Sequence, residues 1–371
     1  MTREKRQYEL DWLRVLATAT VFFFHCARYF DREDWHVKNT QTTLGATIFI
    51  AVLSQWMMPL FFVLSAFSSY HALQRKTGGQ YFSERIKRLA IPLVFGIFFL
   101  IPPQVYIERA THGQYAGTFS SFLPHYFDGW YGFGGNFAWM GLHLWYLLIL
   151  FIFSLLTYPV LRFIGQGRGK ALPEVLGRWA GKPGVLYWLA LPLCLTEFFV
   201  NHHRQTIGQR VFGGWSLLCY LMVFLLAYLL AADERLIESA ARQRYLSLLL
   251  VAIVTPTLMY LFFNRIRVSL LTGSLLRGFN SWIWLMAILG FGRRYLRFET
   301  PFLRRANEAA LPFYILHQTV IVIVGYLMLG WEGSALIEYP ALIGISLAII
   351  LTTYEFLVRR SKPLRFLFGM K

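Results

Sequence analysis

Long apolar runs separated by short polar and basic segments are the dominant pattern of this 371-residue chain. A run of about 20 mainly apolar residues, folded as an α-helix, matches the hydrocarbon thickness of a bilayer. We therefore predict an all-α integral membrane protein with about ten transmembrane helices in one bundle, formed by a single polytopic domain over residues 1–371. The predicted spans are 10–30, 44–70, 89–107, 137–161, 184–200, 211–232, 245–263, 279–296, 311–330 and 336–358.

Composition and charge support this class. Hydrophobic residues make up 56% of the chain and charged residues 15%, compared with about 45–50% and about 25% in soluble domains. The net charge of +17 comes from basic residues in short segments between the apolar runs. This placement indicates membrane topology, and we expect no nucleic-acid partner. The three cysteines lie within predicted spans and lack metal-ligand spacing, so we expect neither disulfides nor a metal site.

The distribution of Lys and Arg predicts the orientation of the spans. Of the 36 basic residues, 26 lie in segments on the same side as the N-terminus, and 9 lie on the opposite side. Because positively charged loops stay in the cytoplasm, we expect both termini to be cytoplasmic. The first apolar run follows a basic N-terminus but contains charged residues and no cleavage pattern, which predicts a retained span.

Arg14 and His25 both lie in the first apolar run, 10–30. Ionisable groups in such a segment cost several kcal/mol unless they face the protein interior or a watery cavity. In an α-helix the two residues are about 16 Å apart and within about 20° of the same face. This pattern favours a site reached from both sides of the membrane. The alternatives are an Arg14 that snorkels to the interface, aided by Asp11 one turn earlier, and a purely structural His25.

A second cluster lies at the entrance to the third span, where Arg85, Lys87 and Arg88 occur in YFSERIKRLAIP. In a regular α-helix Arg85 and Arg88 are one turn apart and share a face. Arginine forks bind phosphate oxygens well, so this cluster is a candidate clamp for the phosphates of coenzyme A. The alternative is ordinary anchoring by positive charge on the cytoplasmic side.

Other polar or aromatic residues in the predicted spans are candidate substrate contacts. For the histidines among them, the alternative is a hydrogen bond between helices. A glutamate would be able to orient the imidazole of His25, but the sequence pairs neither Glu197 nor Glu355 with it. The candidate contacts are His143, Trp145, Glu197 and His317.

Two outer loops differ in character. The loop 108–136 is rich in aromatic residues and glycine, which favours a loop that packs over the mouth of the bundle and contacts a ligand. The shorter loop after the first span is polar, and we expect its charged residues to be mostly solvated. These residues are Asp31, Glu33, Asp34 and His36.

Taken together, these residues resemble the membrane acyltransferase family 3. The resemblance covers most of the chain, and one departure is Ala66, where the family usually has glycine; this change removes no reactive group. The WHVKN segment, the IPPQVYIE segment and the C-terminal tail resemble the branch of the family associated with glucan succinylation. The motifs that carry the resemblance are YELDWLRVLATATVFFFH, MPLFFVLSAFSSY, ERIKRLAIP, HLWYLLILF and LPFYILHQ.

The resemblance implies a ten-helix core in the cell inner (plasma) membrane. Such a core transfers an acyl group, for example succinyl, from cytoplasmic acyl-coenzyme A to a hydroxyl of an extracytoplasmic glycan or lipid-linked sugar. It implies that His25 is catalytic, that Arg14 is essential, and that Arg85 and Arg88 help to hold coenzyme A.

On this interpretation His25 is the general base and no metal is needed. The expected partners are acyl-coenzyme A, the sugar acceptor and membrane lipids. Two other hypotheses stay open. In the first, the chain is a transporter or flippase for an acylated or glycan substrate, with the same polar residues along its path. In the second, it is a non-catalytic partner in a glycan-synthesis complex.

Overall fold

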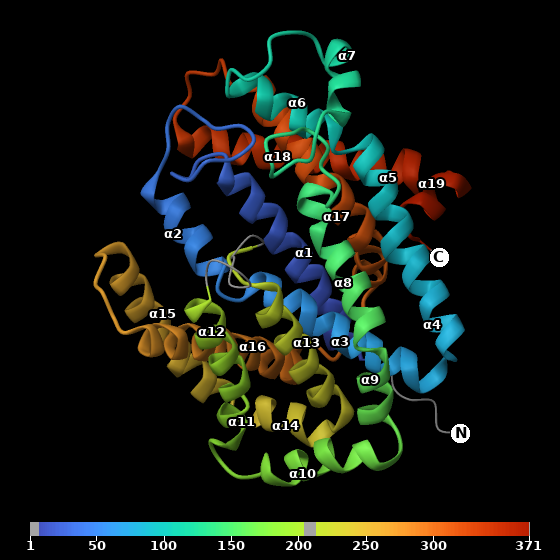
Figure 1. Cartoon of the computed structure of the whole chain (residues 1–371), viewed down its shortest axis with the longest axis vertical. Coiled ribbons are helices and arrows are strands. Elements are labelled where there is room, and N and C mark those ends of the chain that lie inside the picture. Colours follow the sequence, from blue (N-terminus) through green and yellow to red (C-terminus); the bar gives the residue numbers. More distant parts are fainter. Residues whose placement is uncertain (1–6, 204–212, 371) are drawn as a thin grey trace. The chain divides into compact units, whose positions relative to one another are not determined.

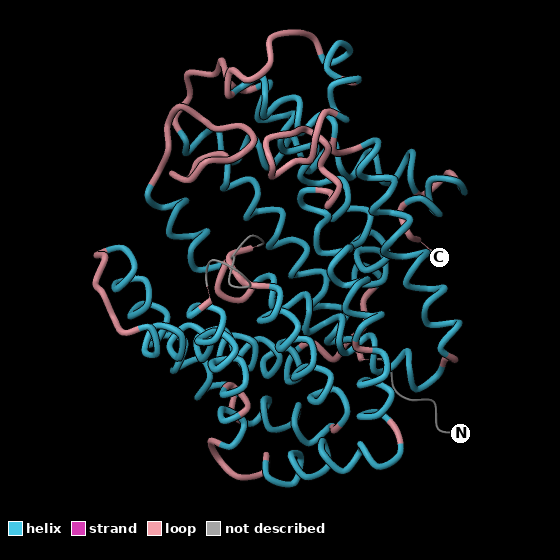
Figure 2. The backbone as a smooth tube through the Cα atoms, in the orientation of Figure 1, coloured by secondary structure: helices cyan, strands magenta, loops and turns pink. Residues whose placement is uncertain are grey.

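The structure, a computed structural model, describes residues 7–203 and 213–370. Within these residues every named element is helical (Figure 2). The β pairing in the same part of the chain is an isolated bridge between Trp130 and Phe137. The prediction of an all-α protein is therefore confirmed.

Among the described residues seven single helices are long and apolar enough to span a membrane, and the count of ten spans stays a prediction. Three bent helix pairs are long and apolar enough when each pair is taken as one span: Gly78–Phe99 with Pro102–Thr111, Leu142–Leu156 with Tyr158–Gly165, and Leu217–Ala232 with Glu234–Arg242. Each predicted span overlaps one of these pairs or one of seven single helices, so the described residues contain seven to ten candidate spans. The side on which the termini lie stays a prediction. The seven are Tyr8–Arg28, Leu44–Arg75, Val185–His202, Arg244–Phe263, Leu270–Tyr295, Pro301–Leu327 and Ala335–Val358.

The chain forms two compact units, and the boundaries between them fall inside several helices. Of the described residues, the first unit contains 7–17, 51–82, 153–203 and 213–304. In this unit α16 (Leu270–Tyr295) contacts α12, α14 and α15, and α13 packs on α3 (Figure 1). Besides α16, the helices of the unit, including those just named, are α3 (Met57–Arg75), α9 (Tyr158–Gly165), η4 (Gly167–Lys170), α10 (Ala171–Trp179), α11 (Val185–Trp188), α12 (Leu191–His202), α13 (Leu217–Ala232), α14 (Glu234–Arg242) and α15 (Arg244–Phe263).

Local sequence explains how these helices begin and pack. Ser216 and Ser269 cap α13 and α16 by accepting hydrogen bonds from backbone N–H groups in the first turn. Gly278 lets α16 approach α12 closely, since a Cβ atom at this position would lie 2.9 Å from the Cα atom of Cys194. The buried Arg293 side chain of α16 forms ion pairs with Glu9 and with two glutamates of α14.

The second unit contains residues 18–50, 83–152 and 305–371, of which 371 lies outside the described part. Its main helix is α17 (Pro301–Leu327), which is hydrogen-bonded to α1, α6 and η3. The unit also takes parts of α1 (Tyr8–Arg28), α2 (Leu44–Leu53), α4 (Gly78–Arg85) and α8 (Trp145–Leu156). Its remaining helices are η1 (Ile86–Ala90), α5 (Ile91–Phe99), α6 (Pro102–Thr111), α7 (Phe119–Phe122), η2 (Pro124–Phe127), η3 (Leu142–Leu144), α18 (Ala335–Thr353), η5 (Tyr354–Val358) and α19 (Lys362–Leu367).

Two short segments, η1 and η5, are π-helical. A π turn closes over one residue more than an α turn, and such turns often occur at functional sites. The predicted shared face of Arg85 and Arg88 assumed regular α geometry. Because the π segment begins at Ile86, the angular spacing between these two arginines differs from the predicted one.

Candidate functional site

Three histidines from three separate segments meet in the second unit. His25 comes from α1, His143 from η3 and His317 from α17. The ring centroids of His25 and His317 are 4.9 Å apart, and those of His143 and His317 are 5.2 Å apart. His317 and His143 are buried, whereas His25 is half-buried. The structure thus brings together three of the predicted site residues.

The hydrogen-bond network assigns the tautomers of His25 and His317. Nδ1 of His317 lies 2.6 Å from the carbonyl oxygen of Tyr314, which can only accept, so this nitrogen carries the proton. Nε2 of His317 is then a lone-pair acceptor, and it lies 3.0 Å from Nδ1 of His25. Nδ1 of His25 also lies 3.0 Å from the carbonyl oxygen of Val21. It therefore donates its proton toward both acceptors, which leaves the lone pair of His25 on Nε2.

This arrangement allows His25 to accept a proton at one defined atom, Nε2. When it does, the Nδ1–H of the resulting imidazolium donates a charge-assisted hydrogen bond to His317. The partner of His25 is thus a second imidazole. Glu355 is ion-paired with Arg359 at 2.7 Å. Glu197 belongs to the first unit, where it is ion-paired with Arg277 at 3.4 Å.

His143 is held in place by its backbone and by Gln104. It follows a tight turn in which Gly141 has a φ of +79°, a conformation that favours glycine. Nε2 of His143 donates to the carbonyl oxygen of Ile315 at 3.1 Å, so its Nδ1 accepts from the amide of Gln104 at 3.4 Å. The same amide donates to Thr319 Oγ1 at 2.7 Å. These bonds tie α6 and η3 to α17.

Sequence reasoning missed the amide part of this network. Gln104 is fully buried, and its carbonyl oxygen accepts a 3.0 Å hydrogen bond from Gln318. Both glutamines lie in or beside apolar runs, in IPPQ and LHQT. A buried amide in such a run needs a partner as much as a charged group does. That requirement is the signal that would have identified them.

Two other predicted substrate contacts have separate surroundings. Trp145 begins α8 and is buried, with its ring centroid 6.5 Å from that of Tyr146. Glu197 is buried in α12, where Oε2 accepts a hydrogen bond from the Cys219 thiol at 3.2 Å. Substrate binding by either residue stays a prediction.

Arg14 lies in the first unit and is bonded there. It donates to Asp11 Oδ1 at 3.0 Å and to Ser68 Oγ at 3.2 Å, and 33% of its side chain is exposed. The contact with Asp11 is the one that the snorkelling alternative predicts. The helix α1 is continuous from Tyr8 to Arg28 and carries both Arg14 and His25. The predicted common helix is confirmed, and an essential role for Arg14 stays a prediction.

The basic cluster at the start of the third span is accessible. Arg85 ends α4 and is half-buried, whereas Lys87 and Arg88 are exposed on η1. The C-terminal tail packs on this segment, because a Cβ atom at Gly369 would lie 3.2 Å from the Cα atom of Arg88. Exposure suits either phosphate binding or anchoring, so both interpretations stay open.

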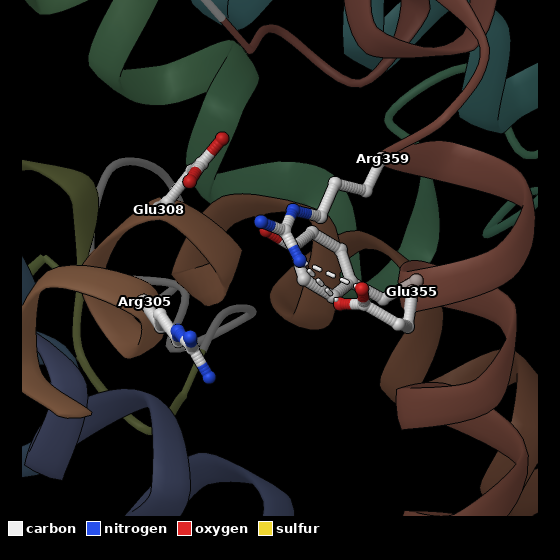
Figure 3. A pocket seen from close by; sticks show the side chains of 5 residues that line it. Arg305, Glu308, Glu355 and Arg359 are labelled. Carbon is white, nitrogen blue, oxygen red and sulfur yellow. Dashed lines mark hydrogen bonds and ion pairs between the residues drawn. The ribbon is translucent and has the colours of Figure 1, made fainter. Parts of the chain in front are cut away.

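A cavity of about 260 Å³ lies elsewhere in the second unit, between side chains of α17 and those of η5 and the residue that follows it (Figure 3). In it Arg359 is bonded to Glu355, and no dashed line joins Arg305 to this pair. None of the residues that we predicted to be catalytic, cofactor-binding or substrate-binding lines it. The lining residues are Arg305, Glu308, Tyr354, Glu355 and Arg359.

The expectation that the polar loop after the first span is mostly solvated is wrong for two of its residues. Asp31 is fully buried and is paired with Arg28 and Lys38. His36 is 8% exposed and its Nδ1 is paired with Glu108. Burial follows because each group has an opposite charge or a hydrogen-bond partner within reach.

Comparison with known sequences identifies the family. The family described as an acyltransferase domain, acyltransferase family 3, matches residues 7–355. The chain belongs to this family. This acyltransferase is therefore a multi-pass membrane protein of a family that transfers acyl groups.

Known relatives of this acyltransferase share a name. It is 21% identical to glucans biosynthesis protein C of Salmonella heidelberg over 386 aligned positions, which cover 99% of this chain and 95% of the relative. It is 26% identical over 161 residues to the proteins of that name from Shigella dysenteriae and Escherichia coli K12. Those two alignments cover 43% of this chain and only 40% of each relative. No solved structure matches the chain.

Proposed function

We propose that this acyltransferase moves an acyl group from cytoplasmic acyl-coenzyme A to a hydroxyl of an extracytoplasmic glucan, at the inner (plasma) membrane. The observation that carries the proposal is the tautomer of the His25 imidazole. Its Nδ1–H is engaged by His317 and by the carbonyl oxygen of Val21, so Nε2 is the nitrogen with a lone pair. The shared name of the relatives supports a glucan acceptor. The resemblance to the glucan-succinylating branch favours a succinyl donor.

In the proposed reaction the acceptor hydroxyl attacks the thioester carbonyl while Nε2 of His25 removes its proton. The carbon–sulfur bond then breaks, and coenzyme A leaves as a thiolate that takes the proton back from His25. His317 stabilises the transient imidazolium through the Nδ1–H···Nε2 hydrogen bond. General-base assistance is typically worth about 10²–10⁴ in rate. Holding the thioester and the hydroxyl in the correct orientation provides much of the remaining acceleration.

Donor binding is assigned to cations on the cytoplasmic side. In the proposal Arg85 and Arg88 hold the phosphates of coenzyme A, with help from Lys87. The support is chemical, because guanidinium forks match phosphate oxygens. The exposure of Lys87 and Arg88 on η1 leaves them accessible to a large anion. The mechanism uses no metal ion.

The test uses the purified full chain in liposomes with succinyl-coenzyme A and a β-glucan oligosaccharide. Thiol release and the mass of the glucan are measured together. We expect free coenzyme A and a glucan that is heavier by one succinyl group. Movement of labelled succinyl-coenzyme A with an intact thioester would instead indicate a transporter.

His25→Ala is expected to abolish product formation at normal protein abundance. The matched control is His202→Ala, because His202 is exposed on α12 of the first unit. The control is expected to keep wild-type turnover. Wild-type product formation by His25→Ala would remove His25 from the mechanism.

A further inference from the structure

Trp35, from the loop between α1 and α2, lies beside the imidazole of His25. The two ring centroids are 6.2 Å apart and the ring planes differ by only 26°. The indole is half-buried, so part of its surface faces away from the protein. An accessible aromatic ring next to a histidine with a free lone pair is a feature that the general-base mechanism does not use.

The loop that carries Trp35 is fixed to the ends of the neighbouring helices. Asp31 accepts from Arg28 and Lys38, and the ammonium of Lys38 also donates to the carbonyl oxygen of Arg28 at 2.6 Å. Further along, Asn39 donates to the buried carboxylate of Glu338 on α18. Buried charges with several partners hold a loop in one conformation.

A second polar cluster supports Trp35 from its C-terminal neighbour. His36 is buried, its ring centroid lies 5.6 Å from that of Trp35, and its Nδ1 is bonded to Glu108 on α6. The hydroxyl of Tyr131 donates to the same carboxylate at 2.9 Å. The residues before and after Trp35 in the sequence are therefore both fixed by polar contacts. A side chain that is already ordered loses little conformational entropy when a ligand binds.

We propose that Trp35 forms the floor of an acceptor subsite that binds a glucosyl unit of the glucan next to Nε2 of His25. A β-glucopyranose carries its hydroxyls around its rim and presents C–H bonds on its two faces. These faces match the apolar, electron-rich face of an indole. In the proposal the sugar stacks on the part of the indole that His25 does not cover, with one rim hydroxyl directed toward Nε2 of His25. This inference rests on the proposed function for its acceptor, and it adds the residue that recognises that acceptor.

The experiment compares Trp35→Leu and Trp35→Phe in the liposome assay with succinyl-coenzyme A and a β-glucan oligosaccharide. Leucine removes the aromatic face, and phenylalanine keeps one. We expect Trp35→Leu to raise the KM for the oligosaccharide about tenfold and Trp35→Phe to raise it much less. The KM for succinyl-coenzyme A is expected to stay unchanged in both. The matched control is Trp331→Leu, at a tryptophan that is 48% exposed on the loop after α17.

A second measurement does not depend on turnover. The wild-type chain is labelled with 5-fluorotryptophan, and the ¹⁹F resonance that disappears in Trp35→Phe belongs to Trp35. We expect this resonance to shift when the β-glucan oligosaccharide is added and to stay in place when succinyl-coenzyme A is added. A Trp35 signal that does not respond to the oligosaccharide would overturn the subsite, whether or not Trp35→Leu folds.

The outcomes separate this inference from the proposed function. If wild-type protein releases no coenzyme A with any sugar, the proposed function fails, and a ¹⁹F shift with the oligosaccharide would still identify a sugar site. If wild-type protein is active but Trp35→Leu keeps the wild-type KM for the oligosaccharide, the subsite fails alone. A variant that only hydrolyses succinyl-coenzyme A faster, with an unchanged sugar KM, shows that Trp35 excludes water and also overturns the subsite.

Discussion

Replacing His317 tests whether the second imidazole orients the first. His317→Leu removes the acceptor that lies 3.0 Å from Nδ1 of His25, while it keeps a side chain of similar volume at a fully buried position. A hydrogen bond to a charged group contributes about 1.5–3 kcal/mol. With about 1.4 kcal/mol for each tenfold change in rate, kcat/KM should fall about 10- to 140-fold. This loss is expected to be smaller than that of His25→Ala.

His317→Gln provides the matched rescue. The carbonyl oxygen of a glutamine side chain can accept from Nδ1–H of His25, and its NH₂ group can donate to the carbonyl oxygen of Tyr314. We expect this variant to recover most of the loss seen in His317→Leu. The assay is thiol release in liposomes at several concentrations of the β-glucan oligosaccharide, with protein abundance and melting temperature measured for each variant.

The double variant separates an orienting role from an independent one. If His317 acts through His25, His25→Ala combined with His317→Leu is no slower than His25→Ala alone, because residues that act as one unit are not additive. A His317→Leu enzyme with wild-type kcat/KM and normal abundance would refute the orienting role. A double variant much slower than His25→Ala would assign His317 a separate function.

Three further predictions concern stability, pH and donor binding. Gln104→Leu should lower the free energy of unfolding by about 1–3 kcal/mol, measured by thermal denaturation in detergent, because it leaves buried partners unsatisfied. The hydrogen bond to Asp34 raises the pKa of His112. This pair should therefore stabilise the loop 29–43 fully below about pH 6.5, and the stabilisation should be lost as the pH rises through the raised pKa of His112. Amide protection of that loop in wild type and His112→Gln measures the effect. Arg88→Ala should raise the KM for succinyl-coenzyme A about tenfold, in thiol-release assays.

Each of these predictions has a control. Gln114→Leu removes an exposed glutamine whose bond is to Arg109, and it should leave the melting temperature nearly unchanged. Equal pH dependence of loop protection in wild type and His112→Gln would contradict the role of the pair. An Arg88→Ala enzyme whose succinyl-coenzyme A KM equals that of the wild type would leave membrane anchoring as the explanation for this arginine.

The sequence predicts the helices well because the signal for them is local. A span is a run of apolar residues, and each of the ten runs overlaps a helix or a bent helix pair. Arg14, His25, His143 and His317 are also identified locally, since an ionisable group in an apolar run is costly without a partner. The apolar run 10–30 placed Arg14 and His25 on one helix, and α1 is continuous through both.

The partners could not be predicted, because each contact depends on how helices far apart in the sequence pack. His25 and His317 are separated by 292 positions, and nothing in either segment specifies the other. Gln104 carries no charge and so gave no electrostatic signal. The π turn at η1 changed a spacing that was worked out for an α-helix. Asp31 has Arg28 at helical i,i+3 spacing, but its second partner, Lys38, lies seven residues away along an irregular loop, so its complete burial could not be predicted.

The engaged Nδ1 of His25 restricts the route of the proton. An imidazole with no hydrogen-bond partner at either nitrogen is able to accept a proton at one nitrogen and release it from the other, as in a proton relay. Here one nitrogen is occupied, so the same atom must take the proton from the alcohol and return it to the departing sulfur. Both reacting atoms must therefore come within hydrogen-bonding distance of a single nitrogen. One proton is taken and one is returned, so His25 ends each catalytic cycle in the protonation state in which it began.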